Sequence, residues 1–201
     1  MAPIIFDDNY RTPYDDLFEE NLNNRILVLN RDIDETLIED YMCFILKWNR
    51  DDKDIPRKKR EPIRLYINSL GGDSFIAGQF CSLIESSETP VVGVAFGTVA
   101  SAAYHIYISC HERYAFRNST FLQHEGDLII SNTSTKAKNT MEFFENMDER
   151  YKQNVLNNSN MSEEYYDSIY TDELWMFADK AKEFGVVDKI IGIDCSIQDI
   201  L

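Results

Sequence analysis

The sequence predicts a single α/β domain over its 201 residues, built on a mainly parallel sheet. Strand-like apolar runs alternate with helix-like patterns along the chain. In one stretch, a strand over 63–68 is followed by a helix over 74–85 and a strand over 91–96, with Pro90 marking the turn before the last strand. A strand, a helix and a strand in this order form two parallel strands joined by a right-handed crossover.

The elements before this unit follow from the same patterning. A strand is predicted over 25–30, and a helix from about residue 33, where Asp32 and Glu35 have the spacing of a capping box. The apolar stripe of this helix consists of Leu37, Tyr41, Phe44 and Trp48. Residues 49–61 are charged and contain a proline, so we expect an exposed loop there.

The second half of the chain continues the alternation. In chain order we expect a turn at Gly97, a helix from about Ser101, strands over 114–116 and 120–123, a helix over 135–157, a helix over 178–184 that Gly185 stops, and a strand over 189–191. The helix over 135–157 has one apolar face, made of Met141, Phe144, Met147, Tyr151 and Val155.

The charge balance excludes several classes of partner. Lys and Arg total 20 against 35 Asp and Glu, which gives a formal net charge of −15. Such a chain repels nucleic-acid phosphates and anionic lipid headgroups, so we expect neither nucleic acid nor a membrane as a partner. The four cysteines are scattered without a CxxC pair, which favours reduced thiols in the cytoplasm. No metal cluster is evident, and no cofactor is expected.

One segment resembles a membrane span by length alone. Residues 89–110 contain no Asp, Glu, Lys or Arg and are about as long as a bilayer span. Two glycines, two serines, a histidine and two tyrosines interrupt this segment, which favours a buried strand followed by a buried helix. The first residues lack a basic region and a long apolar region, so we expect no secretory signal.

Two small-residue segments follow predicted strands and mark a candidate site. Gly71 and Gly72 follow the strand over 63–68, where backbone N–H groups can approach a ligand without an intervening Cβ. Ser101 lies among alanines at the next strand-to-helix junction, where free helix amides can stabilise an oxyanion. Both turns lie at the carboxyl edge of a parallel sheet, so they can meet. The alternative is that Ser101 is a plain helix N-cap.

His124 is the histidine best placed to act with Ser101. It follows the strand over 120–123 and precedes a turn, so its imidazole can reach Ser101 as a general base. A histidine on a surface loop is the alternative. Of the other two histidines, His105 is expected in the core and His111 in a polar turn. A carboxylate that orients the ring has to come from later in the chain.

These residues belong to five blocks that, in order, resemble the ClpP family of serine peptidases, from about residue 14 to 191. The blocks are YD at 14–15 with RILVL at 25–29, LYINSLGG at 65–72 with AG at 77–78, GTVASA at 97–102, NS at 118–119 with His124, and residues 175–188 with Trp175 and Val187-Asp188. The resemblance implies one peptidase domain over 1–201 with a crotonase-like repeated ββα spiral. It also implies an N-terminal segment over 1–20 and a helical handle over about 125–160.

The resemblance also implies a role for each site residue. Ser101 corresponds to the nucleophile and His124 to its base, while the amides of Gly72 and Ala102 correspond to the oxyanion hole. Glu173 stands at the position of the family's aspartate, and the neighbouring Asp172 is the alternative third member.

Three further positions depart from the family pattern. Leu70 replaces a usual proline, Ala102 stands where methionine is common, and the stretch between Gly72 and Ala77 is one residue longer.

By this resemblance the chain is a serine endopeptidase subunit of an ATP-dependent Clp-type protease that degrades unfolded polypeptides inside a chamber. Such subunits form stacked homo-oligomeric rings, and an AAA+ Clp unfoldase feeds them. The sequence has no GxxxxGK[ST] loop, so ATP hydrolysis is expected in the partner. The helix over 135–157 is expected at the contact between rings, and the segments after Gly72 and His124 are expected to hold the substrate as an added strand.

Three other functions compete with this one. A catalytically silent ring subunit or scaffold is favoured by Glu173 and the altered glycine segment. A crotonase-type acyl-CoA enzyme shares the fold and the oxyanion hole but does not need Ser101 and His124. A membrane-linked peptidase with a Ser–Lys dyad would not need His124.

Overall fold

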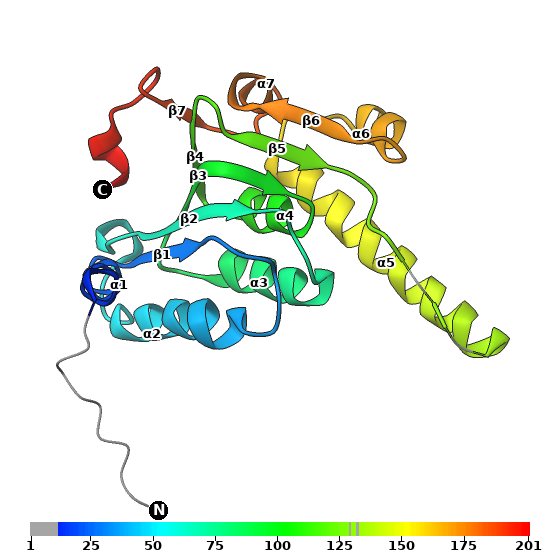
Figure 1. The fold of residues 1–201 in the computed structure, drawn as a ribbon, viewed down its shortest axis with the longest axis horizontal. Coiled ribbons are helices and arrows are strands. Elements are labelled where there is room, and N and C mark those ends of the chain that lie inside the picture. The colour runs from blue at the N-terminus through cyan, green and yellow to red at the C-terminus, as the bar shows by residue number, and fades with distance from the viewer. Residues whose placement is uncertain (1–11, 129, 132) are drawn as a thin grey trace, which may run out of the picture.

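The computed structural model describes residues 12–128, 130–131 and 133–201. In this part of the chain the strands form one seven-stranded sheet (Figure 1). The strands are β1 (Ile26–Leu29), β2 (Ile63–Ser69), β3 (Val91–Ala100), β4 (Glu112–Phe116), β5 (Thr120–Gln123), β6 (Leu174–Phe177) and β7 (Lys189–Ile191). The prediction about a secretory signal falls on the first residues, which lie outside the described part.

Seven α-helices and three short helical turns connect these strands within the described residues. The α-helices are α1 (Pro13–Asn23), α2 (Cys43–Asp51), α3 (Ser74–Ser86), α4 (Ala102–Ile108), α5 (Ser134–Asn158), α6 (Glu163–Ile169) and α7 (Ala178–Glu183). A π-helical turn η2 (Ile38–Met42) leads into α2, and two 3₁₀ turns are η3 (Arg57–Lys59) and η4 (Ile197–Ile200).

The sheet is parallel except at one edge pair, as the sequence predicts. The main strand order is β1-β2-β3-β4-β7, and every pair in it is parallel. Side chains of β2 alternate between buried and half-buried, and the first half of β3 is buried throughout. Apolar burial on both faces of the central strands is typical of parallel sheets that helices cover.

The predicted turn at Gly97 is wrong, because β3 runs straight through it to Ala100. A Cβ at position 97 would lie 2.1 Å from Oδ1 of Asn68, so only glycine fits beside that side chain. The same oxygen accepts a hydrogen bond of 2.8 Å from the Thr98 amide. The longer strand pairs with β4 through Val92–Ala95 and with β5 through Thr98–Ala100.

Figure 1 shows α2, α3 and α4 gathered on one side of the strands, while α5 extends away from the sheet. α3 and α4 supply much of the core, because Phe80, Tyr104 and Tyr107 are fully buried. α5 spans almost the predicted residues, but its apolar face is only partly covered. Val155 is fully buried, whereas Met141 is 46% exposed. None of the described helices is long and apolar enough to cross a membrane.

The other differences from prediction concern one helix cap and three further elements. The predicted capping box of Asp32 and Glu35 is wrong: the helical segment begins only at Ile38, and no side chain caps it. α1, α6 and β6 were not predicted. The sequence carries a local signal for α1, because Thr12 and Asp15 form a capping box around the proline at its first position. β6 exists through its antiparallel pairing with β5, which is a long-range contact.

Candidate active site

Ser101 occupies a strained backbone position between β3 and α4. Its φ is 54° and its ψ is −126°, a conformation that non-glycine residues rarely adopt and that costs about 1–3 kcal/mol. The Ser101 amide donates a 3.0 Å hydrogen bond to the carbonyl of Leu122 on β5. Its side chain accepts no hydrogen bond from the helix amides, so the interpretation as a plain N-cap is wrong. The sharp turn instead presents a half-buried hydroxyl side chain at the end of the strand.

The two glycines after β2 approach Ser101 closely. Gly71 has φ +106°, and a Cβ there would lie 2.7 Å from the Cβ of Ser101 and 2.9 Å from the Ala100 carbonyl oxygen. Gly72 has φ +143°, and a Cβ there would lie 2.4 Å from the carbonyl oxygen of Ile33. The Ile33 amide donates to the Gly71 carbonyl at 2.8 Å. Backbone contact on both sides therefore requires glycine at both positions.

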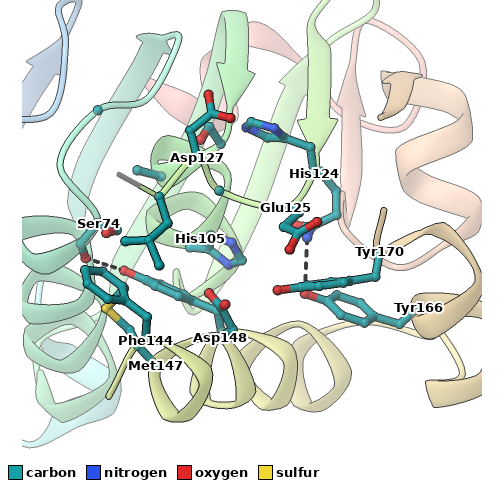
Figure 2. A pocket seen from close by; sticks show the side chains of 17 residues that line it. Ser74, His105, His124, Glu125, Asp127, Phe144, Met147, Asp148, Tyr166 and Tyr170 are labelled. Carbon is teal, nitrogen blue, oxygen red and sulfur yellow. Dashed lines mark hydrogen bonds between the residues drawn. The ribbon is translucent and has the colours of Figure 1, made fainter. Parts of the chain in front are cut away.

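The four residues that the sequence assigned to the nucleophile, the base and the oxyanion hole all line one cavity of about 250 Å³ (Figure 2). They are Gly72, Ser101, Ala102 and His124. The pairing of β5 with β3 explains this proximity, because Ala100 is opposite Leu122 and both active-site candidates follow soon after. The parallel sheet thus brings the two turns and the histidine to one edge, as its topology requires.

His124 is half-buried at this cavity, and Figure 2 shows its imidazole pointing toward the carboxylate of Asp127. Near it lies His105, which is 8% exposed on α4, as expected for a core histidine. Burial, together with the charge of His124, lowers the pKa of His105 to about 3. His105 is therefore neutral at physiological pH. Its ring packs on that of Tyr151, with 4.2 Å between the centroids.

Glu173 and Asp172 are not among the residues that line the cavity. The Glu173 carboxylate is exposed and accepts a 2.9 Å hydrogen bond from the indole N–H of Trp175. Both residues immediately precede β6, which is antiparallel to β5 with Gln123 opposite Leu174. If that register continued by one residue, Glu173 would stand opposite His124 with its side chain on the same face.

Sequence reasoning missed three carboxylates and one amide that line the cavity: Glu125, Asp127, Asp148 and Gln123. Asp148 lies on α5 between Phe144 and Tyr151, so the helical spacing that marks the apolar face also marks Asp148. Burial raises the pKa of Asp148, and its hydrogen bond with Tyr170 partly offsets that effect. Within the described residues, no group of three His, Cys, Asp or Glu side chains is placed to hold a metal ion.

Comparison with known proteins decides the family. The family model described as Clp protease matches residues 10–194. The chain belongs to the Clp protease family. Among curated members, the ATP-dependent Clp protease proteolytic subunit 2 of Treponema denticola is 25% identical over 178 residues, which cover 88% of this chain and 86% of that protein. The protein of the same description from Tropheryma whipplei is 26% identical over 176 residues, covering 87% and 94%.

A solved structure confirms the family fold. A mutant of ClpP1 from Listeria monocytogenes aligns with a TM-score of 0.74 at 22% sequence identity, covering 87% of this chain and 95% of that one. The predicted fold class, a ClpP-like α/β spiral with a helical handle, is thereby confirmed.

Proposed function

We propose that this chain is the serine endopeptidase subunit of a Clp-type protease, with Ser101 as its nucleophile and His124 as the base. One observation carries the proposal. Ser101, on a strained turn, and His124, at the end of the neighbouring strand, line one cavity together with Gly72 and Ala102. A nucleophile on a sharp turn beside free helix amides is the arrangement that acyl transfer requires.

The chemistry follows from these positions. The Ser101 Oγ attacks the carbonyl carbon of a peptide bond while His124 takes the hydroxyl proton. The amides of Gly72 and Ala102 hold the oxyanion of the tetrahedral intermediate. His124 then gives its proton to the departing amine, which leaves an acyl-enzyme on Ser101. A water molecule, deprotonated by His124, hydrolyses that ester and restores the serine.

We assign the third triad role to Glu173 rather than Asp172. The register of β5 and β6, extended by one residue, puts Glu173 on the same face as His124 and Asp172 on the opposite face. To orient the imidazole, the Glu173 carboxylate must leave the indole of Trp175. A glutamate has one more methylene than an aspartate, which supplies part of that reach.

The substrate is bound as an extended strand beside the glycine turn. One side of this turn pairs with Ile33, through the Gly71 carbonyl and the Asp73 amide, each at 2.8 Å. Its other side faces Ser101, as the Gly71 contacts demonstrate. A polypeptide whose backbone pairs with the Ser101 side of this turn and with the segment after His124 presents the carbonyl of the cleaved bond to the nucleophile.

Members of this family form oligomeric rings that work with Clp ATPases. For this chain we propose stacked homo-oligomeric rings in the cytoplasm, fed with unfolded polypeptides by an AAA+ Clp unfoldase. The exposed apolar side chains near the start of α5, among them Met141 and Phe143, support ring contact along this helix. Restricted entry to the chamber then limits which proteins are cut.

A silent ring subunit is the second candidate, since the Glu173 carboxylate is hydrogen-bonded away from the cavity. A fluorophosphonate probe, read by intact-protein mass, separates the two functions. We expect labelling at Ser101 and peptide hydrolysis, and Ser101→Ala should lower hydrolysis by about ten-thousandfold or more. Ser86→Ala, at an exposed position on α3, is the matched control and should keep both. No labelling of assembled protein would establish the silent subunit instead.

A further inference from the structure

The cavity beside Ser101 has polar groups in its wall that the proposed triad does not use. Gln123 is 4% exposed, and its Oε1 has no hydrogen-bond partner among the described residues. Its amide nitrogen is engaged, because Nε2 donates to the Tyr166 hydroxyl at 3.2 Å. The Nδ1 of His105, also buried, lacks a partner in the same part of the chain. A buried polar atom without a partner is costly, so a ligand that supplies a donor to the Gln123 Oε1 gains by entering.

Asp148 adds a negative charge to this wall. Asp148 lies on α5, and Figure 2 shows its carboxylate between His105 and Tyr170. Tyr170 donates its hydroxyl proton to one carboxylate oxygen, which leaves further acceptor positions. Burial raises the pKa of Asp148, so its ionised form gains from any cation placed against it.

The other lining residues of the cavity are of two kinds, acidic and apolar. Glu125 and Asp127 lie at the same cavity, and no lysine or arginine is among its lining residues. Phe144, Met147 and Tyr151 form an apolar and aromatic side of the cavity along α5. Such a surface packs the methylene stem of a long side chain, and a tyrosine face attracts a cation.

We propose that this cavity receives the substrate side chain on the amino side of the cleaved bond and selects lysine or arginine there, with Asp148 and Gln123 as the specificity-determining residues. This inference rests on the proposed function of Ser101. A basic side chain supplies donors to the Asp148 carboxylate and to the Gln123 Oε1. A leucine in the same place packs against the apolar walls but leaves the Gln123 Oε1 without a donor and the Asp148 charge without a cation, which raises the barrier to its cleavage.

The test is a set of fluorogenic peptides that differ only in the residue before the cleaved bond: lysine, glutamine or leucine. We expect kcat/KM for lysine to exceed that for leucine by about tenfold or more. Asp148→Asn, which keeps the shape and removes the charge, should lower the lysine-to-leucine ratio by about tenfold, mainly through KM. Asp148→Glu should retain the preference for lysine. Glu145→Gln, exposed on the same helix and outside the cavity, is the control and should leave the ratio unchanged.

The outcomes separate this inference from the function on which it rests. Because the ratio is taken within one preparation, a partly misfolded variant still gives a valid value. Leucine cleaved as well as lysine, or an Asp148→Asn ratio equal to that of the wild type, would overturn the inference while leaving the endopeptidase intact. Glutamine cleaved as well as lysine would overturn the requirement for a charge. No cleavage of any peptide, with Ser101 unlabelled by fluorophosphonate, would overturn both.

Discussion

Replacing Gly71 with alanine tests how tightly the glycine turn is packed on Ser101. The new Cβ would lie 2.7 Å from the Ser101 Cβ, 2.9 Å from the Ala100 carbonyl oxygen and 3.0 Å from the Ala102 amide nitrogen. Two of these neighbours are backbone atoms, so they can yield only if the strand end moves. Overpacking of this kind costs about 1–3 kcal/mol. The φ of +106° adds about 1–3 kcal/mol for any side chain.

We therefore expect Gly71→Ala to lower the free energy of unfolding by about 4 kcal/mol, the middle of the summed range. Urea unfolding at one fixed protein concentration measures this value, because assembly makes stability depend on concentration. Gly192→Ala is a matched control, since Gly192 has φ +84° and a Cβ there would meet nothing within 4 Å. It should cost only the backbone strain, about 1–2 kcal/mol.

The activity of Gly71→Ala provides a second measurement. Displacement of the Ser101 turn should slow fluorophosphonate labelling, whereas Gly192→Ala should label at the wild-type rate. Equal losses of stability in the two variants would show that the contact with Ser101 does not cost energy, and the packing argument for this turn would be wrong.

Two other predictions concern carboxylates. Glu173→Ala should lower kcat by about a thousandfold or more, whereas Asp172→Ala should stay within about threefold; a larger loss for Asp172→Ala would shift the triad by one residue. Asp52 is 1% exposed and forms an ion pair with Arg25 at 2.6 Å. Asp52→Asn should therefore lower the free energy of unfolding, measured in urea, by about 3 kcal/mol. The control Asp51→Asn, at an exposed position, should lower it by about 0.5 kcal/mol. The Arg25 hydrogen bond lowers the pKa of Asp52 in the folded protein. The contribution of this ion pair to stability is therefore complete above the unfolded-state pKa of about 4, and it is lost as the pH falls through the lower pKa of the folded state. A wild-type acid-unfolding midpoint equal to that of Asp52→Asn would refute this.

Short-range patterns predict the elements that depend on local sequence. The strand over 120–123 and the strand over 189–191 have the predicted bounds, and α5 differs by one residue at each end. The continuation of β3 past Gly97 could not be predicted, because it depends on the Asn68 side chain of a neighbouring strand. β6 was missed for the same reason, since only its pairing with β5 defines it.

The residues of the candidate site also differ in how far the sequence predicts their positions. Parallel topology is enough to predict that Ser101 and His124 approach one edge of the sheet, because each follows a strand. The sequence does not show that Asp148 faces the same cavity, since its position depends on how α5 packs across that edge. Nor does it show that the Glu173 carboxylate is hydrogen-bonded to Trp175 two residues later.

The way β3 divides its pairing has a consequence during synthesis of the chain. Its first half completes the central sheet with β4, and its last residues hold β5, which in turn holds β6. The segments that carry Ser101, His124 and Glu173, the proposed triad, therefore come together only after strands far apart in the sequence have paired. Under the proposed assignment, a nascent polypeptide has no complete triad until β6 has paired with β5.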